Sequence, residues 1–162
     1  MTLNQEFSEE LEDTQHGRFL TFALGKETYG IEIKCVTEII GIQPITPLPE
    51  TADYIKGVIN LRGKVIPVVD VRLKFKKPAV SYDDRTCIIV IETQDIFAGL
   101  IVDNVAEVVF IEDEDIVPPP SYSAGMQNRY ISGIGKTGGN VKLLLDCEQL
   151  FKADEVQVLL NV

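Results

Sequence analysis

Residues 54–75 read YIKGVINLRGKVIPVVDVRLKF, and residues 130–151 read YISGIGKTGGNVKLLLDCEQLF. Seven positions agree at one constant offset: Tyr54, Ile55, Gly57, Gly63, Val65, Asp70 and Phe75 recur as Tyr130, Ile131, Gly133, Gly139, Val141, Asp146 and Phe151. A second set recurs upstream at a slightly shorter offset: Gly30, Val36, Glu38, Ile39 and Ile40 recur as Gly99, Val105, Glu107, Val108 and Val109. The chain is therefore predicted to be an internal duplication, with an insertion in the second copy around Pro118–Pro120.

Short apolar runs separated by glycine, proline and charged pairs predict a mainly β protein. The first copy offers strands over residues 18–24, 28–33, 37–42, 57–61 and 65–69, and the second over residues 86–92, 96–102, 106–111, 130–134 and 141–145. Sheets of such short strands bury little area when open, and closing them removes exposed edges. We expect two tandem five-stranded barrels that share a seam, over about residues 17–83 and 84–152.

The ends of the copies predict short helical turns. Asp70 and Asp146 are typical N-cap residues directly after the last strand of each copy. Residues 1–16 carry many acids and few apolar anchors, which predicts a flexible acidic tail. Residues 153–162 are expected to form a C-terminal helix.

Composition excludes several classes of function. Fifteen basic residues against 25 acidic ones give a net charge of −10, which disfavours nucleic acid as a partner. The three cysteines, Cys35, Cys87 and Cys147, lie far apart in apolar segments and are predicted to be reduced and structural. No apolar run is long enough to span a bilayer, and we expect a cytoplasmic protein that reaches a membrane only indirectly.

Catalytic and cofactor motifs fail on their context. The only histidine, His16, lies in the acidic tail, which argues against a catalytic triad, and no spacing typical of a metal site is present. Residues 133–138 read GIGKTG, the spacing of a dinucleotide fingerprint, but an apolar strand follows where that motif needs a helix. We expect a hairpin tip, no cofactor and no enzyme. A nucleotide-binding enzyme that uses the Gly133–Gly139 loop is the alternative.

The segment Tyr54–Phe75 closely resembles the signature of the CheW-type chemotaxis coupling proteins. The resemblance extends over roughly residues 17–152 and includes Tyr29–Ile31, Val36–Ile39, Pro44–Pro49, Gly99–Val109 and Tyr130–Gly135. It implies a non-catalytic adaptor of two five-stranded SH3-like barrels. Such an adaptor joins the cytoplasmic hairpin tip of a chemoreceptor to the regulatory domain of the histidine kinase CheA. A coupling protein whose pathway controls an output other than motility is a second alternative.

The resemblance also implies two binding faces. The receptor-binding positions that match the family are Val36, Glu38, Gly57, Asn60, Leu61, Arg62, Val105, Gly133 and Ile134, and a kinase contact falls on Tyr122. Five of these positions also fit barrel core or turn residues: Val36, Val105, Ile134, Gly57 and Gly133. Arg62 is the strongest candidate, because it falls opposite Gly138 in the second copy. Gly133 is expected to be partly exposed at the start of a turn, in a groove between the barrels.

Overall fold

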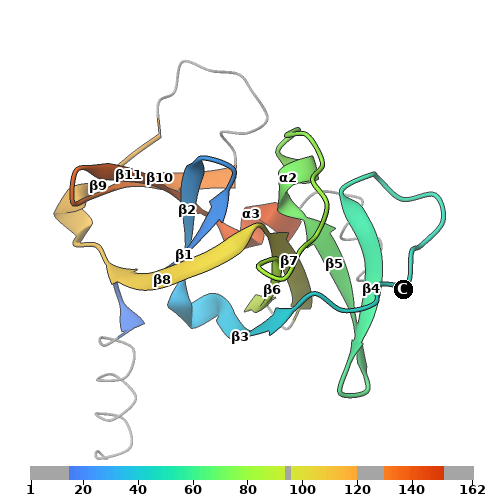
Figure 1. Cartoon of the computed structure of the whole chain (residues 1–162). Helices are drawn as coiled ribbons and strands as arrows, with labels where there is room; N and C mark the ends of the chain where they lie inside the picture. Colours follow the sequence, from blue (N-terminus) through green and yellow to red (C-terminus); the bar gives the residue numbers. More distant parts are fainter. Residues whose placement is uncertain (1–14, 94–95, 120–129, 152–162) are drawn as a thin grey trace, which may run out of the picture.

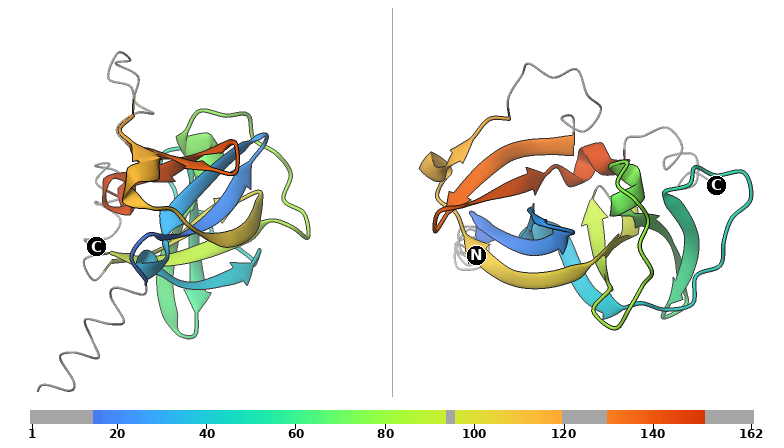
Figure 2. Two further views of the ribbon diagram at one scale, coloured as in Figure 1. Left: turned by 90° about the vertical axis from the view of Figure 1, so that its left-hand side faces the viewer. Right: turned by 45° about the horizontal axis from the view of Figure 1, so that its top comes forward.

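The computed structural model describes residues 15–93, 96–119 and 130–151, and it confirms a mainly β protein made of two sheets that lie side by side (Figure 1). The six-stranded sheet has the order β8 (Asn104–Phe110), β1 (Arg18–Leu24), β2 (Glu27–Glu32), β11 (Asn140–Leu145), β10 (Ile131–Thr137) and β9 (Ile116–Val117). The five-stranded sheet has the order β3 (Val36–Gly41), β6 (Cys87–Thr93), β7 (Ile96–Val102), β5 (Lys64–Asp70) and β4 (Ile55–Leu61). Figure 2 shows both sheets curling, as expected of SH3-like barrels.

The two barrels are not arranged in tandem, so the expected division at residues 83 and 84 is wrong. Each sheet takes its central hairpin from one copy and its remaining strands from the other. The first copy supplies β1 and β2 to the six-stranded sheet and β3, β4 and β5 to the five-stranded sheet. The cause lies in the short links after β2 and β7. The chain passes from β2 to β3 through the single turn η1 (Ile33–Cys35), and from β7 to β8 through Asp103 alone. Both links carry the chain straight into the opposite sheet.

The two sheets have the same order of equivalent strands, β8-β1-β2-β11-β10 in one and β3-β6-β7-β5-β4 in the other, which supports the duplication. In both sheets a parallel pair joins the hairpin of one copy to the last hairpin of the other, β5 with β7 and β11 with β2. In the five-stranded sheet Thr46 pairs with Val58 through two backbone hydrogen bonds of 2.9 Å. The matching place in the other sheet holds β9, which pairs with β10 at Ile134 and Gly135. Strand β9 is the one strand of the described chain that the sequence did not predict.

The largest core cluster lies between the two sheets. Phe22 and Ile31 from one sheet pack with Ile89 and Leu100 from the other, and all four are essentially inaccessible to solvent. A smaller cluster fills the five-stranded barrel and consists of Ile59, Ile66, Val68, Ile88, Val90 and Ile101. Strand β6 contributes to both clusters, because its alternate residues point to opposite faces. This double burial explains its unbroken apolar sequence.

The predicted helical turns are present. In the turn α2 (Val71–Lys74), the Asp70 carboxylate accepts a hydrogen bond from the backbone N–H of Leu73. Asp146 does the same for α3 (Cys147–Phe151), through the N–H groups of Glu148 and Gln149. Most of the acidic tail and the predicted C-terminal helix lie outside the described residues.

A partly buried ion pair fixes α2 to the link where the chain changes sheets. The Arg72 guanidinium donates two hydrogen bonds to the Asp103 carboxylate, at 2.7 and 2.8 Å, and the backbone N–H of Gly25 donates a third at 2.7 Å. The guanidinium holds the pKa of Asp103 below its ordinary value, with the Gly25 N–H contributing. The pair thus joins the β1–β2 turn, α2 and the β7–β8 link.

We expect Arg72→Ala to lower the free energy of unfolding by about 2 kcal/mol at neutral pH, since it removes charged hydrogen bonds and leaves Asp103 without its cation. Because the folded pKa of Asp103 is depressed, this stabilisation is present above the ordinary aspartate pKa and is lost as pH falls through the folded value. Urea unfolding of wild type and variant measures it, and the gap between them should narrow in acid. Arg85→Ala, at an exposed arginine, is the control. Equal losses in both variants would contradict the assignment.

Candidate functional site

The candidate receptor-binding residues divide between the two sheets. Six belong to the five-stranded sheet: Val36 and Glu38 in β3, Gly57, Asn60 and Leu61 in β4, and Arg62 in the turn that follows. Three belong to the six-stranded sheet: Val105 in β8, and Gly133 and Ile134 in β10. The duplication explains this distribution, because β3 and β8 are equivalent strands, as are β4 and β10.

Glu38 and Arg62 are brought together in an ion pair between the two edge strands of the five-stranded sheet. The Arg62 side chain is 72% exposed and that of Glu38 28% exposed, so the guanidinium stands out into solvent while the carboxylate is partly sheltered. An exposed pair of this kind contributes only about 0–1 kcal/mol to folding. Its larger physical effect is to hold a guanidinium with free donor capacity at the rim of the barrel.

Arg62 occupies a backbone conformation that favours glycine. Arg62 and Gly63 form the two-residue turn between β4 and β5 with φ values of 52° and 86°. The equivalent turn between β10 and β11 uses two glycines, Gly138 and Gly139, with φ values of 55° and 80°. Positive φ at both central residues is typical of a type I′ hairpin. The first copy therefore keeps a charged side chain at a strained position that the second copy fills with glycine.

The neighbouring candidates have structural roles. The Asn60 side chain accepts a hydrogen bond of 2.8 Å from the backbone N–H of Gly63, and so stabilises the Arg62 turn. Val36 and Val105 pack from opposite sheets against the shared core, and Leu61 packs against the core of the five-stranded barrel. The seam between the barrels is thus filled with side chains at these positions.

The two glycines in the set are closely packed. A Cβ atom on Gly57 would lie 2.0 Å from the carbonyl oxygen of Thr46, and one on Gly133 would lie 2.7 Å from Cγ2 of Ile116. Gly133 is buried within β10, so the expectation of a partly exposed turn residue is wrong. The sequence misplaced it because β10 continues to Thr137, and the turn begins only at Gly138.

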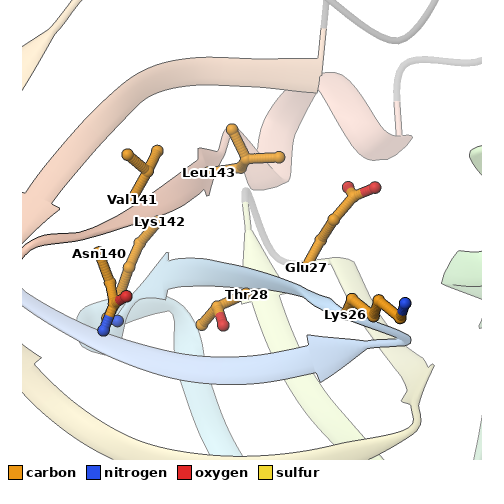
Figure 3. A pocket seen from close by; sticks show the side chains of 7 residues that line it. All are labelled: Lys26, Glu27, Thr28, Asn140, Val141, Lys142 and Leu143. Atoms are coloured by element: carbon orange, nitrogen blue, oxygen red, sulfur yellow. The ribbon is translucent and has the colours of Figure 1, made fainter.

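The same strand removes the basis of the nucleotide alternative. Gly133, Gly135 and Lys136 lie in β10 and pair with β11, and Gly135 also pairs with β9. Their backbone groups are engaged in strand pairing, whereas a phosphate-binding loop needs free N–H groups ahead of a helix. A hollow of about 440 Å³ lies beside this hairpin, between β11 and the start of β2 (Figure 3). It is lined by Lys26, Glu27, Thr28, Asn140, Val141, Lys142 and Leu143, none of them in the Gly133–Gly139 segment.

Sequence reasoning missed a buried cation at the seam. Lys74 is 8% exposed, and its ammonium lies 4.2 Å from the ring centre of Tyr54 and 5.0 Å from that of Tyr130. The two tyrosines are repeat equivalents, and the lysine stands between them in the shared core. The sequence of residues 71–75 does not predict the burial of Lys74. Its contact with both tyrosines depends on how strands from the two copies combine in each sheet.

Other expectations concern residues or features that the structure covers only in part. Tyr122 lies outside the described residues. Across residues 15–93, 96–119 and 130–151, no group of His, Cys, Asp and Glu side chains is placed to hold a metal ion. No helix in this described part is long and apolar enough to cross a bilayer.

Two interleaved barrels with a charged rim, built from duplicated strands, define a double-barrel binding module. Residues 18–155 match the family described as the CheW-like domain. The chemotaxis protein CheW of Klebsiella aerogenes is 39% identical over 150 residues, covering 93% of this chain and 90% of that protein. The CheW protein of Treponema pallidum is 32% identical over 149 residues, covering 90% and 88%. The chain belongs to the CheW-like family.

A solved structure supports the fold. The crystal structure of the scaffolding protein TtCheW from Thermoanaerobacter tengcongensis matches with a TM-score of 0.79 and 35% identity, covering 86% of this chain and 94% of that one. Family membership confirms the resemblance carried by the Tyr54–Phe75 signature. It favours neither of the two alternative functions.

Proposed function

We propose that this member of the CheW-like family, an adaptor for chemotaxis signalling, binds a chemoreceptor's cytoplasmic hairpin on one face and the regulatory domain of CheA on another. Family membership over residues 18–155 supports the adaptor class, and the names of relatives in several bacteria support the chemotaxis pathway. An adaptor of this kind works in the cytoplasm and reaches the inner membrane through receptor arrays. It needs no cofactor.

The observation that carries the receptor face is the Glu38–Arg62 pair. Arg62 adopts a positive φ at the position where the equivalent hairpin has Gly138. The first copy therefore retains backbone strain that the second copy avoids. A helical hairpin offers apolar residues with polar groups beside them, and a guanidinium fork on a barrel rim suits such a surface. We assign partner contact to Arg62 and Glu38, and to the side chains of Val36, Leu61, Val105 and Ile134 where these reach the surface. Asn60, Gly57 and Gly133 position the strands.

The kinase face is assigned to Tyr122 by its match to the family. An aromatic side chain in the segment after Pro118–Pro120 would supply a large apolar contact with few torsions to restrict, as interface hot spots do. A Tyr122→Ala variant should therefore lose CheA binding and keep receptor binding. A normal affinity for CheA, measured by calorimetry on the folded variant, would overturn this assignment.

We expect Arg62→Gly to weaken binding to a purified receptor hairpin fragment at least about tenfold, equivalent to about 1.4 kcal/mol. Affinity for the CheA regulatory domain should stay within about twofold, because the substitution reproduces Gly138 of the other barrel and relaxes the strained turn. Isothermal titration calorimetry with each partner measures both effects.

Lys26→Ala is the matched control for Arg62→Gly, since Lys26 is an exposed cation in the β1–β2 turn of the other sheet. It removes the same charge without touching the Glu38–Arg62 pair. If both variants lost receptor affinity equally, net charge and not the rim of the five-stranded barrel would explain the binding. If Arg62→Gly bound both partners normally, the receptor face would be elsewhere.

A further inference from the structure

Two cysteines that lie far apart in the sequence meet where the two sheets join. A hollow of about 270 Å³ is lined by Cys35 and Cys147 together with the charged residues Glu32, Lys34, Asp146 and Glu148. Cys35 ends the turn η1 that leads into the five-stranded sheet. Cys147 begins α3, which follows β11 of the six-stranded sheet. Both cysteines thus line one hollow, Cys35 from the link into the five-stranded sheet and Cys147 from the turn after the six-stranded sheet.

The environments of the two thiols differ. Cys147 is 5% exposed and belongs to the shared core, whereas Cys35 is half-buried and packs against that core from its edge. A hydrogen bond with the Cys147 side chain lowers the pKa of Cys35, and the Lys34 ammonium contributes to this shift. Burial and the nearby Glu32 and Glu148 carboxylates oppose it. The same bond, with burial, raises the pKa of Cys147. The more exposed Cys35 is therefore the thiol that a dissolved oxidant reaches first, with Cys147 buried behind it.

We propose that Cys35 and Cys147 form an oxidation site of this protein, at which a peroxide converts the two thiols into a disulfide that joins the barrels. The Cys35 thiolate attacks one oxygen of hydrogen peroxide, the O–O bond breaks, and the leaving hydroxide takes a proton to become water. Cys35 is then a sulfenic acid. The Cys147 sulfur attacks the sulfenic sulfur, the S–O bond breaks, and the Cys147 proton leaves with the hydroxide as a second water. The two thiols lose two electrons and the peroxide gains them.

The third cysteine is excluded by the register of β3 and β6. Val36, next to Cys35, pairs with Ile91, whereas Cys87 pairs with Gly41 at the far end of the same two strands. At about 3.3 Å per residue, Cys87 lies roughly 13 Å along the strand from the position that pairs with Val36, and Cys35 lies one residue beyond Val36. This is too far for a disulfide without movement of the backbone. The Cys87 thiol instead donates a hydrogen bond of 3.2 Å to the carbonyl of Arg85. Cys87 is therefore the natural internal control.

The test oxidises the reduced full-length protein with hydrogen peroxide and maps its cysteines by mass spectrometry without reduction. Wild type should lose about 2 Da and yield a peptide pair that joins Cys35 to Cys147. Titratable thiols should fall from three to one, and a reducing agent should restore all three. Cys87→Ser should give the same cross-link, and Cys35→Ser should give none.

A trapping experiment tests the first oxidation step separately from disulfide formation. In Cys147→Ala, peroxide should leave Cys35 as a sulfenic acid that a dimedone probe captures, whereas wild type should show little capture because the disulfide forms. The proposal is overturned if wild type retains three thiols under peroxide. It is also overturned if Cys35 proceeds to sulfinic acid without a cross-link, or if the cross-link that forms involves Cys87 or a second chain.

Discussion

Gly57→Ala is expected to lower the free energy of unfolding by about 3 kcal/mol or more. The added Cβ would lie 2.0 Å from the carbonyl oxygen of Thr46 and 2.6 Å from its carbonyl carbon. Both are backbone atoms, and Thr46 is held in place by its two hydrogen bonds with Val58. The φ value of 141° at Gly57, beside a shift in the β4–β5 register, adds strain for any residue with a side chain.

Gly41→Ala is the matched control for Gly57→Ala. Gly41 ends β3 in the same sheet, and a Cβ there would meet nothing within 4 Å. Its unfolding free energy should stay within about 0.5 kcal/mol of wild type. Urea unfolding followed by circular dichroism compares the three proteins. A Gly57→Ala protein as stable as Gly41→Ala would show that Thr46 can move away from β4, which the closure of this barrel does not allow.

Gly133→Glu is the second large effect, and we expect it to destabilise the protein by several kcal/mol. The side chain would start 2.7 Å from Cγ2 of Ile116 and would bring a carboxylate into a buried position of β10. A groove position would instead have given a stable protein with impaired binding. The burial of Gly133 favours packing, so loss of receptor binding in this variant should follow from loss of the fold.

Two further variants separate the causes in Gly133→Glu. Lys136→Glu places the same carboxylate at an exposed position of the same strand and should be nearly neutral. Adding Ile116→Ala to Gly133→Ala removes the atom that the new Cβ would strike, and should recover part of the loss measured for Gly133→Ala alone. A Gly133→Glu protein that unfolds at the wild-type urea concentration would contradict the packing role.

Local pattern was enough to predict the strands. Alternating and continuous apolar runs gave ten strands that the structure confirms, within a few residues at each end. Pattern could not show that the copies exchange hairpins. That exchange depends on the direction in which η1 and Asp103 send the chain, which is a property of the packed sheets and not of either segment. Strand β9 was missed because Ile116 and Val117 are too few to show a period.

For the candidate site too, the sequence predicts some features and not those that depend on how the sheets pack. The repeat singled out Arg62, because its partner position in the second copy is Gly138, and the structure places it in an ion pair with Glu38. Repeat matching could not tell a packed glycine from a binding position, and so it misjudged Gly133. The sequence predicts Cys35 and Cys147 as separate structural thiols, because only the crossing from one barrel to the other brings them to the same hollow.

Co-sedimentation with receptor-containing membranes tests the central claim most directly. Purified CheA is mixed with the membranes, with and without this protein, and the CheA in the pellet is measured. The adaptor account predicts that CheA pellets strongly only when the protein is present, and that Arg62→Gly removes most of this recruitment while Lys26→Ala keeps it. Equal pelleting of CheA with and without the protein would contradict the account, as would displacement of the protein from the membranes by CheA.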